Sequence, residues 1–121
     1  MFKVSIEDKI SAAHHLRGYN GKCSEPHGHN WKVIVRVMVK KLNNIGLAID
    51  FYDLRSITKN VVDLLDHKDL NELEYFSDLN PSSENIARFL YKSIQEQLPA
   101  DVQLEEVEVV ESEGCNVTYS E

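Results

Sequence analysis

The stretch WKVIVRVMVK, residues 31–40, has a period of two residues. One set of alternate positions is wholly apolar: Trp31, Val33, Val35, Val37 and Val39. The other set is mixed: Lys32, Ile34, Arg36, Met38 and Lys40. Because successive side chains of a strand point to opposite faces, the stretch predicts a long strand with one apolar face and one mixed face. The apolar face has to be buried, so we expect a sheet packed against a second layer.

A shorter alternation lies upstream, where Phe2, Val4 and Ile6 alternate with polar residues and predict a first strand. Residues 18–28 contain three glycines and one proline and predict a loop between the two strands. After the long strand, residues 42–46 predict a turn, and residues 47–49 predict a short extended piece.

The apolar period then becomes helical. Spacings of three to four residues join Leu54, Ile57, Val61, Leu64 and Leu65, and Phe51 can extend this stripe. Asp50 is a good N-cap candidate for this helix. A second helix is predicted to begin after Ser82 as its cap and to end before Pro99. Its apolar stripe consists of Ile86, Phe89, Leu90, Ile94 and Leu98.

Two more strands are predicted after the helices. Leu104, Val107 and Val109 lie in the first, and Cys115, Val117 and Tyr119 lie in the second, after a turn at Gly114. We expect Cys115 to be a small core residue. The order β-β-α-α-β-β predicts an α+β fold, a four-stranded antiparallel sheet with two helices on one face. The mixed face of residues 31–40 then stays uncovered, and oligomerisation could close the two sheet edges.

Length and composition favour one domain spanning residues 1–121. The 121 residues carry a formal net charge of −7, which disfavours nonspecific binding to nucleic acid. No apolar run of membrane-spanning length occurs. The first residues, MFKVSIED, contain acidic residues where a targeting peptide would have basic or apolar ones. Two cysteines make no disulfide framework, so we expect a cytoplasmic protein.

Four of the five histidines lie between residues 14 and 29. His27 and His29 project to the same side of an extended backbone, where two imidazoles can bind one metal ion. His14 or His15 could supply a third imidazole. Three histidines without an obvious fourth ligand form the ligand set of an open, catalytic zinc site. A metal-free pair of surface histidines is the simpler interpretation of the H-x-H motif alone. The second pair, His14 and His15, makes metal binding the better interpretation.

Cys23 lies four residues before His27 in the glycine-containing loop. It could be an ordinary loop thiol, a fourth zinc ligand or a catalytic base, because a nearby cation lowers the pKa of a thiol. Asp66 and His67 form a possible acid–base pair, although a histidine that complements a helix dipole is the simpler interpretation of His67.

Acidic residues are frequent between positions 105 and 113. Most such carboxylates are solvated, but Glu111 shares strand parity with Val107 and Val109 and is predicted to point inward. An inward carboxylate suits a ligand with paired N–H donors. Glu84 could do the same, although a position near a helix N-terminus also explains it.

Taken together, seven segments resemble the 6-pyruvoyltetrahydropterin synthase family, in order and through essentially the whole sequence. They are SAAH (11–14), CSEPHGHN (23–30), GLAIDF (46–51), LDH (65–67), LN (70–71), NPSSEN (80–85) and VES (110–112). The resemblance implies the tunnelling fold (T-fold), a β-β-α-α-β-β unit that agrees with the periodicities. It also implies trimers built around a twelve-stranded barrel, or dimers of trimers forming a homohexamer, which would cover the mixed sheet face.

Three residues separate Cys23 from His27, as in the bacterial and archaeal 6-carboxy-5,6,7,8-tetrahydropterin synthases of queuosine biosynthesis. The resemblance therefore implies a lyase that converts 7,8-dihydroneopterin triphosphate to 6-carboxytetrahydropterin, with loss of acetaldehyde and triphosphate. The alternative is a 6-pyruvoyl synthase or a paralogue that cleaves the pterin side chain.

The resemblance also implies roles for individual residues. His14, His27 and His29 match the Zn²⁺ ligands, and Cys23, Asp66 and His67 match the catalytic group. Glu111 matches the carboxylate that binds the pterin, and Glu84, Ser82 and Ser83 match further substrate-binding positions. His15 has no assigned role.

A noncatalytic zinc- or pterin-binding module is a separate hypothesis, and the presence of the three catalytic matches disfavours it. A protein held together by structural zinc is another, and it predicts that Cys23 is a fourth ligand.

Overall fold

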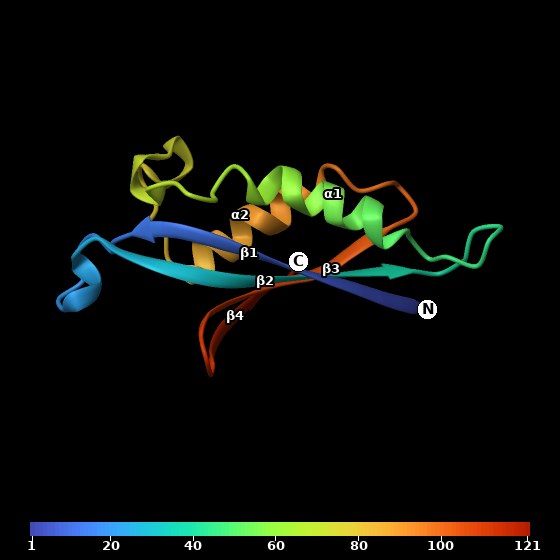
Figure 1. Cartoon of the computed structure of the whole chain (residues 1–121), viewed down its shortest axis with the longest axis horizontal. Coiled ribbons are helices and arrows are strands. Elements are labelled where there is room, and N and C mark those ends of the chain that lie inside the picture. The colour runs from blue at the N-terminus through green and yellow to red at the C-terminus, as the bar shows by residue number, and fades with distance from the viewer.

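The computed structural model describes residues 1–121 and contains four strands and two α-helices. The strands are β1 (Phe2–His14), β2 (His27–Val39), β3 (Gln103–Ser112) and β4 (Cys115–Tyr119), and the helices are α1 (Phe51–Val62) and α2 (Ser83–Gln95). Short 3₁₀ turns occupy Lys22–Ser24, Leu70–Glu72 and Glu74–Phe76. The predicted β-β-α-α-β-β order is confirmed (Figure 1).

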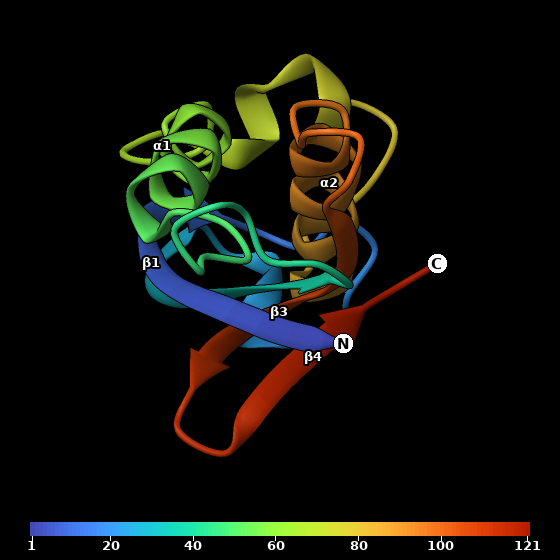
Figure 2. The same ribbon diagram turned by 90° about the vertical axis from the view of Figure 1, so that its right-hand side faces the viewer.

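The four strands form one antiparallel sheet in the order β1-β2-β3-β4. Both helices cover the same face of this sheet, and the β3–β4 hairpin curls away from the helical layer (Figure 2). The predicted α+β architecture with two helices on one face is therefore correct. Neither helix has the length and apolar character that crossing a membrane requires.

The periodicity of residues 31–40 has the predicted structural effect. The apolar set is buried between the sheet and the helices: Trp31, Val33, Val35, Val37 and Val39. The alternate residues lie on the face that the helices do not cover, where Arg36 forms ion pairs of 2.9 Å with Glu106 and with Glu108. A register shift next to Arg36 puts an extra residue into β3. This bulge allows Leu104 and Val107 to be buried although their numbers differ in parity.

The predicted helix caps are confirmed. Asp50 accepts a hydrogen bond from the backbone N–H of Tyr52, and Ser82 accepts one from the N–H of Asn85. The predicted stripe on α1 is wrong at its two ends, where Phe51 is 60% exposed and Leu64 is 55% exposed. Since α1 ends at Val62, Leu64 lies in the following turn and no longer follows the helical period.

Three smaller predictions are also corrected. Residues 47–49 do not form the predicted extended piece: Ala48 and Ile49 lie in a bend, after a loop in which the side chain of Asn43 accepts hydrogen bonds from the N–H groups of Ile45 and Leu47. The helix α2 ends at Gln95, before Leu98. Cys115 is exposed, not part of the core, because it begins β4 directly after the turn at Gly114.

The strand β1 continues past the predicted alternation to His14, and residues 66–69 lie along its outer edge. The N–H of His67 donates to the carbonyl of Ser11 at 2.6 Å, and the N–H of Ala13 donates to the carbonyl of Lys68 at 3.0 Å. Ala13 and Asp69 also form a parallel bridge. We call residues 66–69 the edge segment. It fixes the position of the Asp66–His67 pair beside the end of β1.

Candidate metal centre and its cavity

Three histidines meet where β1 ends and β2 begins. His14 and His27 are opposite each other in the β1–β2 ladder, and His29 is two residues further along β2. One nitrogen from each of the three rings lies within 4.8 Å of the others. The antiparallel register therefore brings together the cluster that the sequence predicted, and it selects His14 over His15 as the third member.

Backbone carbonyls orient two of the rings. The Nδ1 atom of His14 lies 2.7 Å from the carbonyl oxygen of Pro81, and the Nδ1 atom of His27 lies 2.7 Å from that of Glu25. A carbonyl oxygen can only accept, so each Nδ1 carries a proton, and in the neutral form of either ring Nε2 has the lone pair that a metal ion needs. The Nε2 atom of His14 is buried and has no hydrogen-bond partner.

The environment also favours a neutral His14. Burial lowers the pKa of His14 below its ordinary value, although the hydrogen bond to Pro81 acts in the opposite direction. A neutral imidazole with its Nδ1 held by a carbonyl is the usual form of a metal-ligating histidine. The buried acceptor at Nε2 of His14 thus fits a metal ion, and the three-histidine set is typical of catalytic zinc sites.

A cavity of about 330 Å³ adjoins the histidines. It is lined by His14, Leu16, Cys23, His27, Ser82, Ser83, Glu84, Glu111, Cys115, Asn116 and Val117. Cys23 enters from the 3₁₀ turn Lys22–Ser24, and this loop is attached to the end of β1 by a 2.7 Å hydrogen bond from the N–H of Leu16 to the carbonyl of Cys23. The exposed thiol of Cys23 therefore faces the same space as His14 and His27.

The start of α2 forms a second wall of the cavity. Ser82 uses its hydroxyl oxygen to cap the helix, and Glu84 lies in the first helical turn. The hydroxyl of Ser83 accepts a 3.1 Å hydrogen bond from the indole N–H of Trp31 and donates a 3.3 Å bond to Oε1 of Glu111.

Glu111 reaches the cavity from β3, as its strand parity predicts. Its Oε1 atom lies 3.8 Å from Nε2 of His29, a member of the histidine cluster. The two predicted functional groups, the histidine cluster and the inward glutamate, therefore belong to one site.

Asp66 and His67 form a real pair outside this cavity. Oδ2 of Asp66 lies 3.0 Å from Nδ1 of His67, and Oδ1 accepts a 2.8 Å hydrogen bond from the N–H of Ser11. Burial raises the pKa of Asp66, but the hydrogen bonds from Ser11 and His67 lower it more, so the carboxyl is more acidic than usual. The pair does not line the cavity within its own chain.

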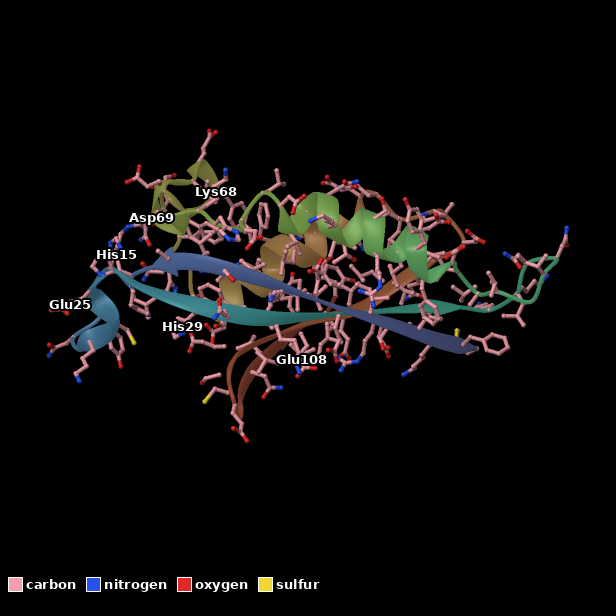
Figure 3. The ribbon with its side chains drawn as sticks, in the orientation of Figure 1. His15, Glu25, His29, Lys68, Asp69 and Glu108 are labelled. Carbon is pink, nitrogen blue, oxygen red and sulfur yellow. The ribbon has the colours of Figure 1, made fainter.

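His67 has an unusual backbone conformation and an exposed ring. Its φ angle is +59°, in the left-handed region, and its side chain is 82% exposed. It lies beyond α1, which ends at Val62, so the helix-dipole explanation for His67 is wrong. Figure 3 shows the neighbouring Lys68 and Asp69 on the helical side of the sheet, close to His15, whereas His29 lies further along β2.

Several residues of the site were not identified from the sequence. The cavity wall formed by Cys115, Asn116 and Val117 could have been inferred from the turn at Gly114, which folds β4 back beside Glu111. The sequence pattern predicts only a core position for Trp31. Its bond to Ser83 had no sequence signal, since it depends on how α2 meets the sheet.

Comparison with known proteins agrees with this geometry. Residues 3–121 match the family model described as 6-pyruvoyl tetrahydropterin synthase. The 6-carboxy-5,6,7,8-tetrahydropterin synthase of Haemophilus influenzae is 33% identical over 117 residues, covering 78% of this chain and 83% of that protein. The human 6-pyruvoyl tetrahydrobiopterin synthase is 35% identical over 103 residues, covering 82% and 70%.

The solved structure of the Caenorhabditis elegans 6-pyruvoyl tetrahydropterin synthase has the same fold. It superimposes with a TM-score of 0.84 at 27% identity and covers 100% of this chain and 97% of that chain. Since the family model spans nearly all residues and includes the histidine cluster, the chain belongs to the 6-pyruvoyl tetrahydropterin synthase family.

Proposed function

We propose that this protein is a zinc-dependent lyase that converts 7,8-dihydroneopterin triphosphate to 6-carboxy-5,6,7,8-tetrahydropterin, releasing acetaldehyde and triphosphate. The observation that carries the proposal is one cavity lined by two of the clustered histidines, the thiol of Cys23 and the carboxylate of Glu111. The relative from Haemophilus influenzae that bears this product's name supports the choice. We further propose that the product enters 7-deazaguanine (queuosine) biosynthesis in the cytoplasm.

His14, His27 and His29 would hold the zinc ion through their Nε2 atoms, since Nδ1 of both His14 and His27 faces a carbonyl. A zinc ion in this position supplies Lewis acidity toward the oxygens of the substrate side chain. The histidines themselves would bind the metal ion and fix its position in the site. The register of the β1–β2 ladder, the burial of His14 and the carbonyl contacts of His14 and His27 keep the ligand set in place before substrate arrives.

Cys23 and Glu111 act on the substrate from two sides of the cavity. The thiolate of Cys23 removes a proton from the pterin side chain, as general base catalysis requires. Glu111 accepts two N–H bonds from the amino-pyrimidine edge of the pterin, a charge-assisted bidentate contact. Ser82, Ser83 and Glu84 lie on the α2 wall, where they contact the bound pterin.

Asp66 and His67 complete the proton transfers in the site of a neighbouring chain. They lie outside the cavity of their own chain, and the exposed ring of His67 is held by Asp66 at 3.0 Å. Asp66 fixes the tautomer of His67, so its Nε2 is available to exchange a proton. This arrangement requires a homo-oligomer, which we propose to be a trimer or a dimer of trimers.

A 6-pyruvoyl synthase is the second candidate, and the 35% identity to the human enzyme favours it. The two reactions differ by a single hydrolysis. Loss of triphosphate alone leaves a pyruvoyl side chain, and addition of one water splits that side chain into a carboxylate and acetaldehyde. A paralogue that cleaves the side chain earlier would release a different pterin product.

Mass spectrometry of the products formed from 7,8-dihydroneopterin triphosphate separates these candidates. We expect 6-carboxytetrahydropterin together with equimolar acetaldehyde from the zinc-loaded protein. A pyruvoyl product without acetaldehyde would replace the first proposal by the second. Zinc-loaded protein that releases neither triphosphate nor acetaldehyde would support a noncatalytic zinc- or pterin-binding module. Zinc bound to Cys23 at about 2.3 Å would support a structural zinc site instead.

A further inference from the structure

Trp31 is the only tryptophan of the sequence, and it lies directly beneath the proposed site. Its side chain is completely buried. Its ring centroid lies 4.8 Å from that of His14 and 5.3 Å from that of His29, in edge-to-face arrangements. The indole therefore contacts two members of the histidine cluster and also reaches the start of α2.

Hydrogen-bond chemistry gives the contact between Trp31 and Ser83 a fixed direction. An indole N–H can only donate, so the oxygen of Ser83 must accept at 3.1 Å. The hydroxyl then has one proton left to donate. Oε1 of Glu111, at 3.3 Å, is an acceptor, so that proton points to the carboxylate.

The carboxylate of Glu111 is thereby held at one oxygen. Oε1 faces Ser83 and lies 3.8 Å from Nε2 of His29, whereas no group of the chain donates to Oε2. Oε2 and the second lone pair of Oε1 are therefore available to a ligand in the cavity. Without Trp31, the Ser83 hydroxyl could rotate and accept from another donor, and Glu111 would lose its fixed partner.

We propose that Trp31 is a positioning residue, whose N–H fixes the hydroxyl of Ser83 as a donor and thereby orients Glu111 toward the cavity. We call these three residues the Trp31–Ser83–Glu111 network. Its consequence for pterin binding rests on the proposed function of Glu111. The network itself does not depend on that function, because its bonds exist without a ligand.

The indole N–H resonance of Trp31 tests the network without a pterin. The single tryptophan gives one such signal in a ¹⁵N-correlated NMR spectrum. We expect Ser83→Ala to move this signal upfield through loss of the acceptor. Glu111→Gln should move it less, in the same direction, because the bonds in a network polarise one another. An indole chemical shift that does not change in Ser83→Ala would overturn the network, whatever ligand the protein binds.

The affinity for neopterin tests the consequence, measured by calorimetry on protein with equal zinc content. Trp31→Phe keeps an aromatic ring and removes the indole donor together with part of the buried ring, so Ser83→Ala, which removes the same hydrogen bond without changing the core, is measured beside it. We expect Trp31→Phe to weaken neopterin binding by up to about tenfold, the range expected for losing one neutral hydrogen bond. Ser83→Ala should weaken binding by a similar factor, and the double variant should bind little worse than either single variant, because both remove the same network.

Tyr91→Phe is the matched control, since the hydroxyl of Tyr91 donates to the carbonyl of Leu104 in the core, away from the cavity. It removes one buried hydrogen bond and should leave neopterin affinity unchanged. Equal losses in Tyr91→Phe and Trp31→Phe would show a purely structural role for Trp31 and overturn the proposal. The proposal would also be overturned if the fold-losses of neopterin affinity of Trp31→Phe and Ser83→Ala multiplied in the double variant.

The failure of the proposed function has a different signature. Wild-type protein that does not bind neopterin, together with an indole signal that responds to Ser83→Ala, would remove the pterin function and keep the network. Where Trp31→Phe fails to fold, Ser83→Ala with the native Trp31 still carries both measurements. Unchanged affinity in that variant would overturn the role of the network in binding.

Discussion

Nε2 of His29 and Oε1 of Glu111 lie 3.8 Å apart, although the two residues are on different strands and 82 positions apart in the sequence (111 − 29). This contact joins the histidine cluster to the only carboxylate of β3 that lines the cavity. Under the proposed pterin-binding role of Glu111, these two neighbouring strands place the bound substrate beside the histidines.

Glu111→Gln should weaken pterin binding much more than it weakens the fold. The substitution removes the charge that a bidentate contact requires and keeps the shape of the side chain. We expect the Michaelis constant for the pterin substrate to rise at least about tenfold, with a change in unfolding free energy below about 0.5 kcal/mol. Glu113→Gln, at an exposed position of the same hairpin, is the control. An unchanged Michaelis constant in Glu111→Gln would contradict the binding role.

Cys23→Ala should abolish turnover and leave the zinc content intact. The thiol lines the cavity, while the three histidines alone form the ligand group that the structure brings together. Metal content measured by mass spectrometry and triphosphate release measured by a colorimetric assay test the two halves of this expectation. Loss of zinc in the variant would instead identify Cys23 as a fourth ligand.

His27→Ala should lose metal and activity together, because two remaining histidines bind zinc far more weakly than three. The matched control is His15→Ala, which changes an adjacent histidine that contacts Asn71 and not the cluster. Equilibrium dialysis followed by metal analysis gives the comparison. Full activity of metal-free His27→Ala protein would rule out the zinc mechanism.

The lowered pKa of Asp66 predicts a pH-dependent contribution to stability. An acid with a lower pKa in the folded state stabilises the fold above its ordinary pKa of 3.8, and this stabilisation is lost as the pH falls through the folded-state value. Asp66→Asn keeps an acceptor for the N–H of Ser11 and removes the charge. Urea unfolding should show wild type more stable by about 1 kcal/mol at pH 7. The stabilities of wild type and variant should converge as the pH falls below 3.8, and a constant difference through the acid range would contradict the assignment.

Asp50→Ala should destabilise the protein by about 1 kcal/mol through loss of the α1 cap. The side chain lies away from the cavity, so zinc content and the Michaelis constant should not change. Asp53→Ala, in the same helical turn, is the control, because Asp53 is not the cap. Equal destabilisation by both variants would attribute the effect to charge near the helix end and not to capping.

The fold was predictable because its strongest signals are local and periodic. The alternation of residues 31–40 and the caps Asp50 and Ser82 each determine an element from a few neighbouring residues. The errors lie at the ends of elements, whose positions the periodicity does not determine. Leu64 follows the helical period in sequence, yet α1 ends before it. Cys115 has the size of a core residue, but its position after the Gly114 turn places it at the surface.

The candidate site was predictable to the extent that motifs carry it. His27, Gly28 and His29 are adjacent, and the register of a hairpin brings His14 opposite His27. The wall formed by β4 and the bond from Trp31 to Ser83 depend on how separate elements pack. No residue type or spacing encodes such a distance. The position of Asp66–His67 outside the cavity likewise follows from the path of the edge segment.

The edge segment has a further consequence for strand addition. Because residues 66–69 already bond to the backbone of Ser11 and Ala13, a strand arriving from another molecule meets an open edge of β1 only before Ser11. The incoming strand must therefore stop short of the histidines, whatever its sequence. The edge segment thus limits how far an added strand can pair along β1. It also keeps the exposed ring of His67 beside the point where that strand would end.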